Sequence, residues 1–362
     1  MRQQGRLQVL VVDDSPLLAR LLTAELNRHG GVHARVGSSG LPRLRDELVR
    51  YHPDVIVLDL ALRACDTLDL LHKLRLYYPV PVIVSARNIG EDAVRAVQAV
   101  QLGALDVVRR PEVIREPELR ALAQELVVKI RVAASAARPV PHFVGAAEPP
   151  ISFEAAGINP DRHVIAVGAS TGGTRALEVM LGRMPADTPP IVMVQHMPAG
   201  FTHSFAARLN SASAVHVSEA VDGERLDVGR AVLARGDTHL VVRRAGRQWC
   251  VRYTNQEPVN RHCPSVDVLF DSVAAKVGPS AIGVLLTGMG NDGAQGLLRV
   301  REAGGITIAQ SKATCVVYGM PKVAVDLGAA MATAAPEDVP RLATRLLHKA
   351  AISSMASSNQ PE

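Results

Sequence analysis

The chain has 362 residues, enough for two domains that each bury a hydrophobic core. Hydrophobic residues make up 48% of it, as in ordinary globular proteins, and the formal net charge is +5. The basic residues are scattered and aromatic residues reach only 3%, so neither a basic stripe nor a stacking platform for nucleic acid is predicted.

The cysteines are far apart and form no CxxC pair, which argues against a zinc site and a disulfide framework. They are Cys65, Cys250, Cys263 and Cys315. The sequence carries no signal-peptide pattern, and no apolar run reaches the roughly 18 residues of a membrane span. We therefore expect a cytoplasmic protein that does not insert into membranes.

The N-terminal third alternates short apolar runs with helical patterns. Four runs rich in β-branched residues predict buried parallel strands, at 7–12, 54–60, 80–86 and 105–110. After the first run, a helix is expected that Ser15 caps and Gly30 ends. The leucines of its predicted core face are Leu17, Leu18, Leu21, Leu22 and Leu26. This alternation predicts a doubly wound α/β domain over residues 1–125.

The rest of the chain predicts a second domain of the same class. Residues 126–158 are assigned to the end of a helix and a linker rich in Pro, Gly and Ala. From 159 to 350 the strand–helix alternation resumes, which predicts a Rossmann-like parallel sheet with a β-rich insertion in its middle. The polar tail, 351–362, is expected to be disordered. The fold class is therefore α/β, with two doubly wound parallel-sheet domains.

Polar residues follow or end several strands of the first domain. Asp13 and Asp14 come after the first strand, Asp59 lies at the end of the run 54–60, Ser85 at the end of 80–86, and Arg110 ends the run 105–110. The carboxyl ends of parallel strands meet at one sheet edge, where ligands bind in open α/β folds. Three carboxylates there predict a Mg²⁺ site, and a carboxylate oxygen of Asp59 could attack a phosphoryl donor. The hydroxyl of Ser85 and the charge of Arg110 would hold the phosphoryl oxygens. The alternative is that the acidic residues merely cap helices.

This pattern resembles the receiver domain of bacterial two-component response regulators, over residues 7–125. The resemblance implies that Asp59 accepts phosphate from a sensor histidine kinase, with Mg²⁺ bound by the two aspartates after the first strand. The sequence departs from the family in three places. Arg63 and Thr67 stand where receivers usually have Pro and Gly, and Arg110 stands where they have Lys. Arg keeps the charge of Lys but not its compact geometry.

The second domain opens on "VIAVGASTGGT", residues 164–174, which contains the pattern G-x-S-x-G around Ser170. Glycines at these positions allow a sharp strand-to-helix turn that exposes the serine, and the helix N-terminus offers N–H groups to an oxyanion. A glycine-rich turn of this kind could instead bind phosphate. A nucleophilic serine also requires a base and a carboxylate that orients the base.

Two later strand ends supply such residues. His196 ends the apolar run "PPIVMVQH", and Asp292 lies in the glycine-rich loop of "VLLTGMGNDGAQG". Taken singly, His196 could be a packed or solvated histidine, and Asp292 a helix cap. Three strand ends that offer Ser, His and Asp at one sheet edge favour a catalytic triad. The chain order Ser, His, Asp differs from that of the α/β-hydrolases.

Five blocks of this domain resemble the protein-glutamate methylesterases of bacterial chemotaxis, the CheB family. The blocks are "VIAVGASTGGTRALE", "VMVQHMPAGFTHSFAARLN", "PSVDVLFDSVA", "VLLTGMGNDGAQGL" and "GITIAQSKATCVVYGMPKVAV". The resemblance implies that Ser170 is the nucleophile, His196 the base and Asp292 the orienting acid. It also places Thr171 and Met289 near the oxyanion.

The same resemblance implies the substrate and the regulation. The substrates would be γ-glutamyl methyl esters on chemoreceptors, with deamidation of receptor glutamines as a second activity, and hydrolysis would need no cofactor. Phosphorylation of the receiver would relieve an inhibition of the esterase. Two alternatives stay open. The altered receiver could be a docking module insensitive to phosphate, or the chain could be a non-catalytic signalling scaffold.

Overall fold

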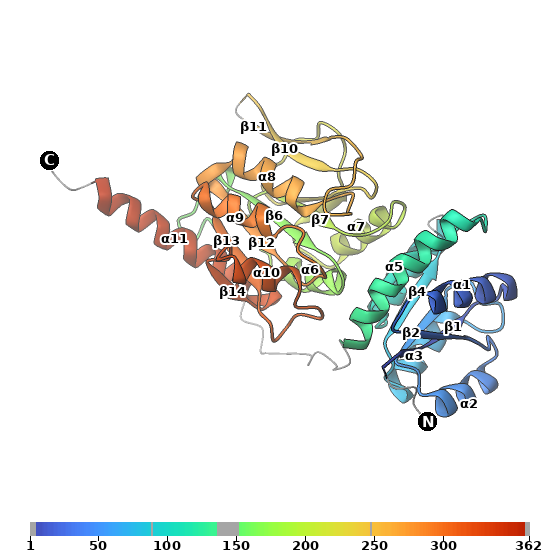
Figure 1. Ribbon diagram of the computed structural model, residues 1–362. Coiled ribbons are helices and arrows are strands. Elements are labelled where there is room, and N and C mark those ends of the chain that lie inside the picture. Colours follow the sequence, from blue (N-terminus) through green and yellow to red (C-terminus); the bar gives the residue numbers. More distant parts are fainter. Residues whose placement is uncertain (1–4, 88–89, 136–151, 247, 359–362) are drawn as a thin grey trace. The chain divides into compact units, whose positions relative to one another are not determined.

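The computed structural model of the chain forms two compact units, Met1–Pro139 and Val140–Glu362 (Figure 1). Each unit contains one large parallel β-sheet with helices on both faces. The structure describes residues 5–87, 90–135, 152–246 and 248–358. Much of the predicted linker, residues 136–151, lies outside these ranges.

The first unit has a five-stranded sheet in the order β2-β1-β3-β4-β5, which is the flavodoxin-like order. All four strand pairings are parallel. The strands are β1 (Leu7–Val12), β2 (Val32–Gly37), β3 (Val55–Asp59), β4 (Val82–Ala86) and β5 (Asp106–Arg109). The helices are α1 (Pro16–Arg28), α2 (Leu41–Tyr51), α3 (Thr67–Tyr77), α4 (Gly90–Gln101) and α5 (Glu116–Ser135).

The apolar faces of α1 and α5 pack on this sheet and close its core. Ser15 caps α1 as predicted, and accepts a hydrogen bond from the backbone N–H of Leu18. The predicted core face of α1 is wrong in part, because Leu17 and Leu21 are 61% and 38% exposed. Both lie beside the stripe that faces the sheet. That stripe is narrower than predicted and contains Leu18, Leu22 and Leu26.

The second unit has a seven-stranded parallel sheet in the order β14-β13-β12-β6-β7-β9-β8. Its strands are β6 (Val164–Ala169), β7 (Ile191–Gln195), β8 (His216–Glu219), β9 (Arg230–Leu233), β12 (Ala281–Leu285), β13 (Ile306–Gln310) and β14 (Ala332–Ala334). Its α-helices are α6 (Gly173–Leu181), α7 (Phe201–Ser211), α8 (Val266–Lys276), α9 (Ala294–Glu302), α10 (Met320–Asp326) and α11 (Val339–Ser358). Short 3₁₀ turns are η1 (Pro160–Arg162), η2 (Gly278–Ser280) and η3 (Pro336–Asp338). The predicted fold class is confirmed for both units.

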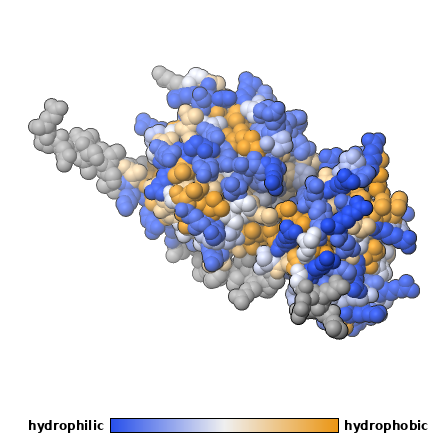
Figure 2. Space-filling view, in the orientation of Figure 1, coloured by the Kyte–Doolittle hydropathy of each residue, from blue (hydrophilic) through white to orange (hydrophobic). Residues whose placement is uncertain are grey.

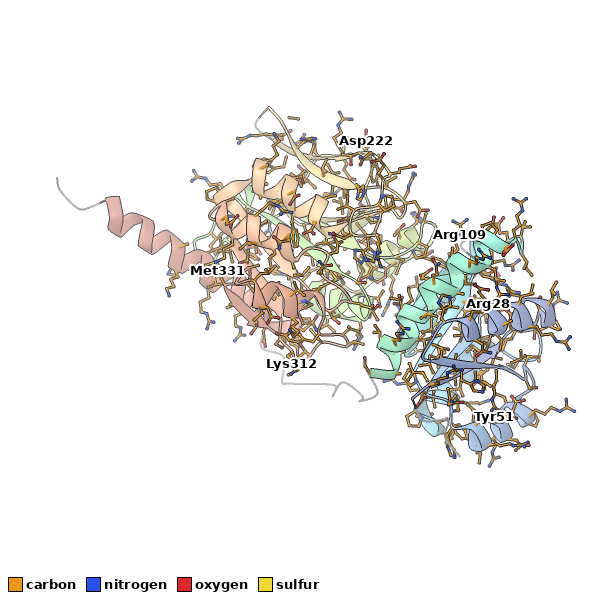
Figure 3. All side chains as sticks on the ribbon, viewed as in Figure 1. Arg28, Tyr51, Arg109, Asp222, Lys312 and Met331 are labelled. Atoms are coloured by element: carbon orange, nitrogen blue, oxygen red, sulfur yellow. The ribbon has the colours of Figure 1, made fainter. Side chains whose placement is uncertain are left out.

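The predicted β-rich insertion is smaller than expected. β8 and β9 belong to the main sheet, and only β10 (Leu240–Ala245) and β11 (Gln248–Tyr253) form a separate antiparallel hairpin. Asp222 holds the end of this hairpin, because its carboxylate accepts hydrogen bonds from the Arg252 side chain at 2.9 Å and the Tyr253 backbone at 2.8 Å (Figure 3). The turn residues between the short strands of this region therefore belong to two kinds of connection. Some join strands of the main sheet, and others belong to the hairpin.

The predicted disorder of the C-terminal tail is wrong for 351–358, because α11 continues to Ser358. The alanines of this stretch are strong helix formers and extend the preceding helical turns despite the polar composition. Hydrophilic side chains cover much of the face seen in Figure 2, with apolar patches between them. Within the described residues, every helix is too short or too polar to cross a bilayer.

Candidate active site

Ser170 lies at the turn between β6 and α6, as the sequence predicted. Its backbone carbonyl accepts a hydrogen bond from Gly173 N–H at 2.7 Å, which closes a tight turn. Gly172 within this turn has φ 78°, a conformation that favours glycine, and precedes the first residue of α6. The side chain of Ser170 is therefore presented at a helix N-terminus, where N–H groups and the helix dipole favour developing negative charge.

His196 follows the neighbouring strand, β7. Ala169 of β6 is paired with Gln195 of β7, and the backbone N–H of His196 donates to the Ala169 carbonyl at 3.0 Å. This continuation of the ladder places Ser170 and His196 side by side on adjacent strands, which lie about 4.8 Å apart in a sheet. Nε2 of the His196 ring is 2.8 Å from Oδ2 of Asp292. Nδ1 of the ring is buried and has no hydrogen-bond partner within the described ranges.

Asp292 lies in the loop between β12 and α9 and is 1% exposed. Besides the His196 ring, its carboxylate accepts hydrogen bonds from the Ser265 hydroxyl at 2.7 Å and from the Asn260 amide at 2.8 Å. It also accepts from the backbone N–H groups of Val266 at 2.7 Å and Asp267 at 3.3 Å, the first two residues of α8. The carboxylate is thus fixed by donors from three segments.

The protonation of this pair follows from the contacts. Burial by itself would raise the pKa of Asp292. The hydrogen bond and the charge of His196, with the hydrogen bonds from Asn260 and Ser265, outweigh it and hold that pKa below its usual value. An ionised Asp292 accepts the proton on Nε2, so a neutral His196 carries its lone pair on Nδ1. In the serine-protease arrangement the acid binds Nδ1, whereas here Asp292 lies against Nε2.

Gly288 brings the β12 loop against the serine. A Cβ at this position would lie 2.7 Å from Cβ of Ser170 and 2.2 Å from Sδ of Met320, so only glycine fits. Met289 is the next residue, and Thr171 directly follows the serine and is nearly buried. Thr171 therefore borders Ser170 along the chain, and Met289 follows the glycine that lies against it. That these two residues stabilise the oxyanion stays a prediction.

Sequence reasoning missed the residues that fix the site from behind. The buried side chain of Gln195 donates to the carbonyl of Ser170 at 2.9 Å and to that of His196 at 3.2 Å, and so ties the two strand ends together. The position of Gln195 in the sequence, directly before His196, could have pointed to this role. Asn260 and Ser265 contact Asp292 from a stretch without periodicity, and no local pattern pointed to them.

In the first unit, the structure brings the predicted acidic residues and Arg110 together at the carboxyl edge of the sheet. The guanidinium of Arg110 pairs with the Asp59 carboxylate through Nη1 and with Oδ1 of Asp13 through Nη2, the latter at 3.0 Å. Burial and the neighbouring Asp59 charge raise the pKa of Asp13, against a backbone hydrogen bond from Ser15 and the charge of Arg110. Arg110 is therefore the cation that offsets these crowded carboxylates.

The other predicted residues of this edge take different partners. Asp14 accepts a hydrogen bond from the backbone N–H of Arg63, which ties the loop after β3 to the loop after β1. Ser85 is buried and lies opposite Asp59 in the β3–β4 register. Thr67 is fully buried as the first residue of α3.

The side chains at this edge decide whether it could hold a metal ion. Carboxylate oxygens are ligands that Mg²⁺ prefers. As arranged, however, no three His, Cys, Asp or Glu side chains of the described part could hold one metal ion. The predicted set of Asp13, Asp14 and Asp59 does not fit Mg²⁺ while Arg110 pairs with two of its members.

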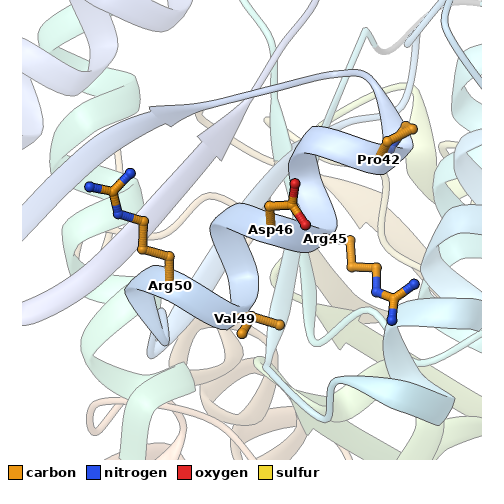
Figure 4. Close-up of a pocket in the computed structure, with 5 residues that line it drawn as sticks. All are labelled: Pro42, Arg45, Asp46, Val49 and Arg50. Carbon is orange, nitrogen blue, oxygen red and sulfur yellow. The ribbon is translucent and has the colours of Figure 1, made fainter.

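A surface depression also lies on the first unit. It is lined by side chains of α2 alone: Pro42, Arg45, Asp46, Val49 and Arg50 (Figure 4). None of these is a predicted site residue, and a shallow hollow along one helix offers no converging groups for chemistry.

The comparisons with known proteins agree with these two units. The CheB methylesterase family matches residues 165–342, and the response regulator receiver domain family matches residues 9–124. The protein-glutamate methylesterase/protein-glutamine glutaminase 1 of Xanthomonas euvesicatoria is 43% identical over 357 residues, 96% of this chain and 98% of the relative. The protein-glutamate methylesterase/protein-glutamine glutaminase of Salmonella typhimurium is 42% identical over 325 residues, 90% of this chain and 92% of the relative.

A solved structure matches the second unit. The CheB methylesterase catalytic domain of Thermotoga maritima superposes with a TM-score of 0.50 at 39% sequence identity, and the match covers 51% of this chain and 98% of that domain. The resemblance seen in the sequence blocks is thereby confirmed. The chain belongs to the CheB family of protein-glutamate methylesterases, and carries a response regulator receiver domain ahead of its methylesterase domain.

Proposed function

We propose that this chain hydrolyses γ-glutamyl methyl esters of chemoreceptors and deamidates receptor glutamines, with Ser170 as nucleophile, His196 as base and Asp292 as orienting acid. One observation carries the proposal. The buried His196 ring is held at Nε2 by Asp292 and keeps Nδ1 without a partner in the described structure, one strand away from Ser170. A ring held in this way can accept a proton at one defined atom.

The proposed reaction uses two acyl-transfer steps. Oγ of Ser170 attacks the ester carbonyl while Nδ1 of His196 takes its proton, and the tetrahedral intermediate forms beside Thr171 and Met289. The intermediate then expels the methoxy group, which takes the proton from His196 and leaves as methanol. Water hydrolyses the acyl-enzyme by the same route and releases glutamate. With a glutamine side chain, ammonia leaves in place of methanol. Hydrolysis by this route needs no cofactor.

Two readouts on the wild-type chain test the proposal. We expect methanol release from membranes that hold methylated receptors, and covalent labelling of Ser170 by a fluorophosphonate, located by mass spectrometry. Labelling does not require a receptor. Labelling without methanol release would therefore mean that the receptor is the wrong substrate, and an absence of labelling would mean that Ser170 is not an activated nucleophile. A chain that neither releases methanol nor takes the label contradicts the proposal and favours the scaffold alternative. Ammonia release from unmethylated receptors tests the glutaminase activity separately.

We also propose that Asp59 accepts a phosphoryl group from a sensor histidine kinase and that this regulates the esterase. The match to the receiver family and the place of Asp59 at the sheet edge support it. Receivers use Mg²⁺ for this reaction, and the pairing of Arg110 with Asp59 and Asp13 would have to open before these carboxylates could hold the ion. The docking-module alternative is favoured by one observation: Arg110 already pairs with Asp59 and Asp13. The proposed partners place the protein in the cytoplasm.

The Arg110→Lys variant of the full chain is expected to bind Mg²⁺ about tenfold more tightly than the wild type, a difference of about 1.4 kcal/mol. A lysine ammonium is a compact point charge without the planar fork of the guanidinium, so it fits less well between the two carboxylates that Arg110 pairs with. Isothermal titration with Mg²⁺ measures the affinity, and Arg109→Lys, at an exposed neighbouring arginine (Figure 3), is the matched control. Equal affinities of wild type and Arg110→Lys would show that the arginine does not compete with the ion.

A further inference from the structure

A tight turn at residues 259–262 lies against the proposed catalytic pair. Val259 and His262 exchange two backbone hydrogen bonds, of 3.0 and 2.9 Å. The residues between them, Asn260 and Arg261, have φ values of 53° and 67°. Positive φ at both central positions is the pattern of a type I′ turn, which normally selects Asn or Gly, so an arginine there is unfavourable. Such a conformation persists where its surroundings enforce it, and it occurs often at functional sites.

The first side chain of this turn holds two carboxylates. The amide nitrogen of Asn260 donates to Oδ1 of Asp292 at 2.8 Å and to Oδ2 of Asp267 at 2.6 Å. The two aspartates carry like charges in a buried region, and a neutral donor shared between them offsets their repulsion. Asn260 therefore sets where the carboxylate of Asp292 lies and, through it, the Nε2 side of the His196 ring.

The last side chain of the turn covers the ring itself. The imidazoles of His262 and His196 are stacked, with centroids 3.7 Å apart and planes 10° from parallel. Asp292 restrains the His196 ring at its edge, and His262 restrains it across its face. Together they limit the rotation of the ring about both of its side-chain bonds. When His196 takes the serine proton it becomes a cation, which the π face of a neutral neighbouring ring stabilises.

We infer that the turn 259–262 is a positioning device for the catalytic base, with Asn260 holding the orienting acid and His262 holding and stabilising the His196 ring. This inference rests on the proposed function of His196. The His196 ring contacts Asp292 of the β12–α9 loop at its edge and His262 of the turn across its face. Asp267 of α8 lies behind them, with Arg299 of α9 3.9 Å from its carboxylate.

Two substitutions at His262 separate ring positioning from folding. His262→Ala is expected to lower kcat for methanol release about 10- to 100-fold with KM changed less than about twofold, because a misplaced base affects chemistry rather than binding. His262→Phe keeps an aromatic face and is expected to recover kcat to within about fivefold of the wild type.

A third substitution isolates the amide. Asn260→Gly tolerates the positive φ and removes only the donor shared by the carboxylates, and it is expected to lower kcat about tenfold. His216→Ala changes an exposed histidine on β8 and serves as the control with unchanged kinetics. The rate of fluorophosphonate labelling of Ser170 should follow the order of kcat in all four variants.

The outcomes are distinct. If the wild type neither labels nor releases methanol, the proposed function fails, and the inference fails with it. If the wild type is active and His262→Ala matches it in kcat, the inference alone is overturned. Loss of activity in His262→Ala that His262→Phe does not restore, together with a lowered melting temperature, would show a structural role and would also overturn it.

Discussion

The Ser170→Ala variant is expected to lose methanol release altogether, with kcat lower by about 10⁴-fold or more. The methyl group of alanine cannot form the acyl-enzyme, and the base has no proton to take. Binding of the receptor should be unchanged, because the side chain is small and nearly buried. Methanol release under saturating receptor measures kcat, and co-sedimentation with receptor membranes measures binding.

The same variant decides between the two interpretations of the glycine-rich turn. Ser170→Ala leaves Gly172, Gly173 and the N-terminus of α6 in place, so a loop that merely binds phosphate would keep its function. If Ser170 is the nucleophile, by contrast, the variant loses its activity. Ser211→Ala, at an exposed serine that ends α7, is the matched control and should keep full activity. Residual activity of Ser170→Ala above about a hundredth of the wild type would contradict the role of the serine.

The sequence predicted which residues meet at the proposed active-site edge because strand ends are local signals. An apolar run followed by a polar residue fixes which residue leaves the sheet, and a parallel sheet brings such residues to one edge. That reasoning placed Ser170 and His196 on neighbouring strands and brought Asp292 to the His196 ring. The β12–β6–β7 order, which sequence alone does not fix, makes the three strands adjacent.

The donors around the carboxylate could not be predicted in the same way. Asn260 and Ser265 reach Asp292 from an irregular segment whose course depends on the whole domain. The stack of His262 on His196 likewise depends on a turn that carries an arginine at positive φ, against local preference. Local rules fail where tertiary contacts enforce an unfavourable conformation, and such places gather around functional sites.

The receiver edge shows a second limit of sequence reasoning. The pattern placed Asp13, Asp59 and Arg110 at one edge, and they do meet there. It predicted a metal ion between the carboxylates, whereas an arginine supplies the positive charge in the structure. Both arrangements satisfy the same electrostatic demand, so the residue types alone do not choose between them. The planar fork of arginine, with its donors in a fixed geometry, suits this pairing with two carboxylates.

The Asp292→Asn variant is expected to lower kcat by about 10³- to 10⁴-fold. The Oδ1 position of this side chain faces three donors, whereas the Oδ2 position faces the Val266 N–H and Nε2 of His196, so the new NH₂ group fits better at Oδ2 although it loses the Val266 bond. There it donates to Nε2 of His196 and moves the ring proton to Nδ1, where the lone pair is needed. Asp271→Asn, at an exposed acid of α8, is the matched control and should keep its activity.

Stability should fall in the same variant, and its pH dependence identifies the cause. Replacing the charge at 292 weakens several hydrogen bonds in a buried network, at about 3 kcal/mol near pH 7. The pKa of Asp292 is lower in the folded chain than the value of about 3.9 usual for an unfolded one. Its stabilising contribution is therefore complete above that value and decreases as the pH falls through and below it. Urea unfolding at pH 7 and near pH 3 should show the gap between wild type and Asp292→Asn narrowing in acid. A gap of constant size would mean that the ionised carboxylate is not what the surrounding donors stabilise.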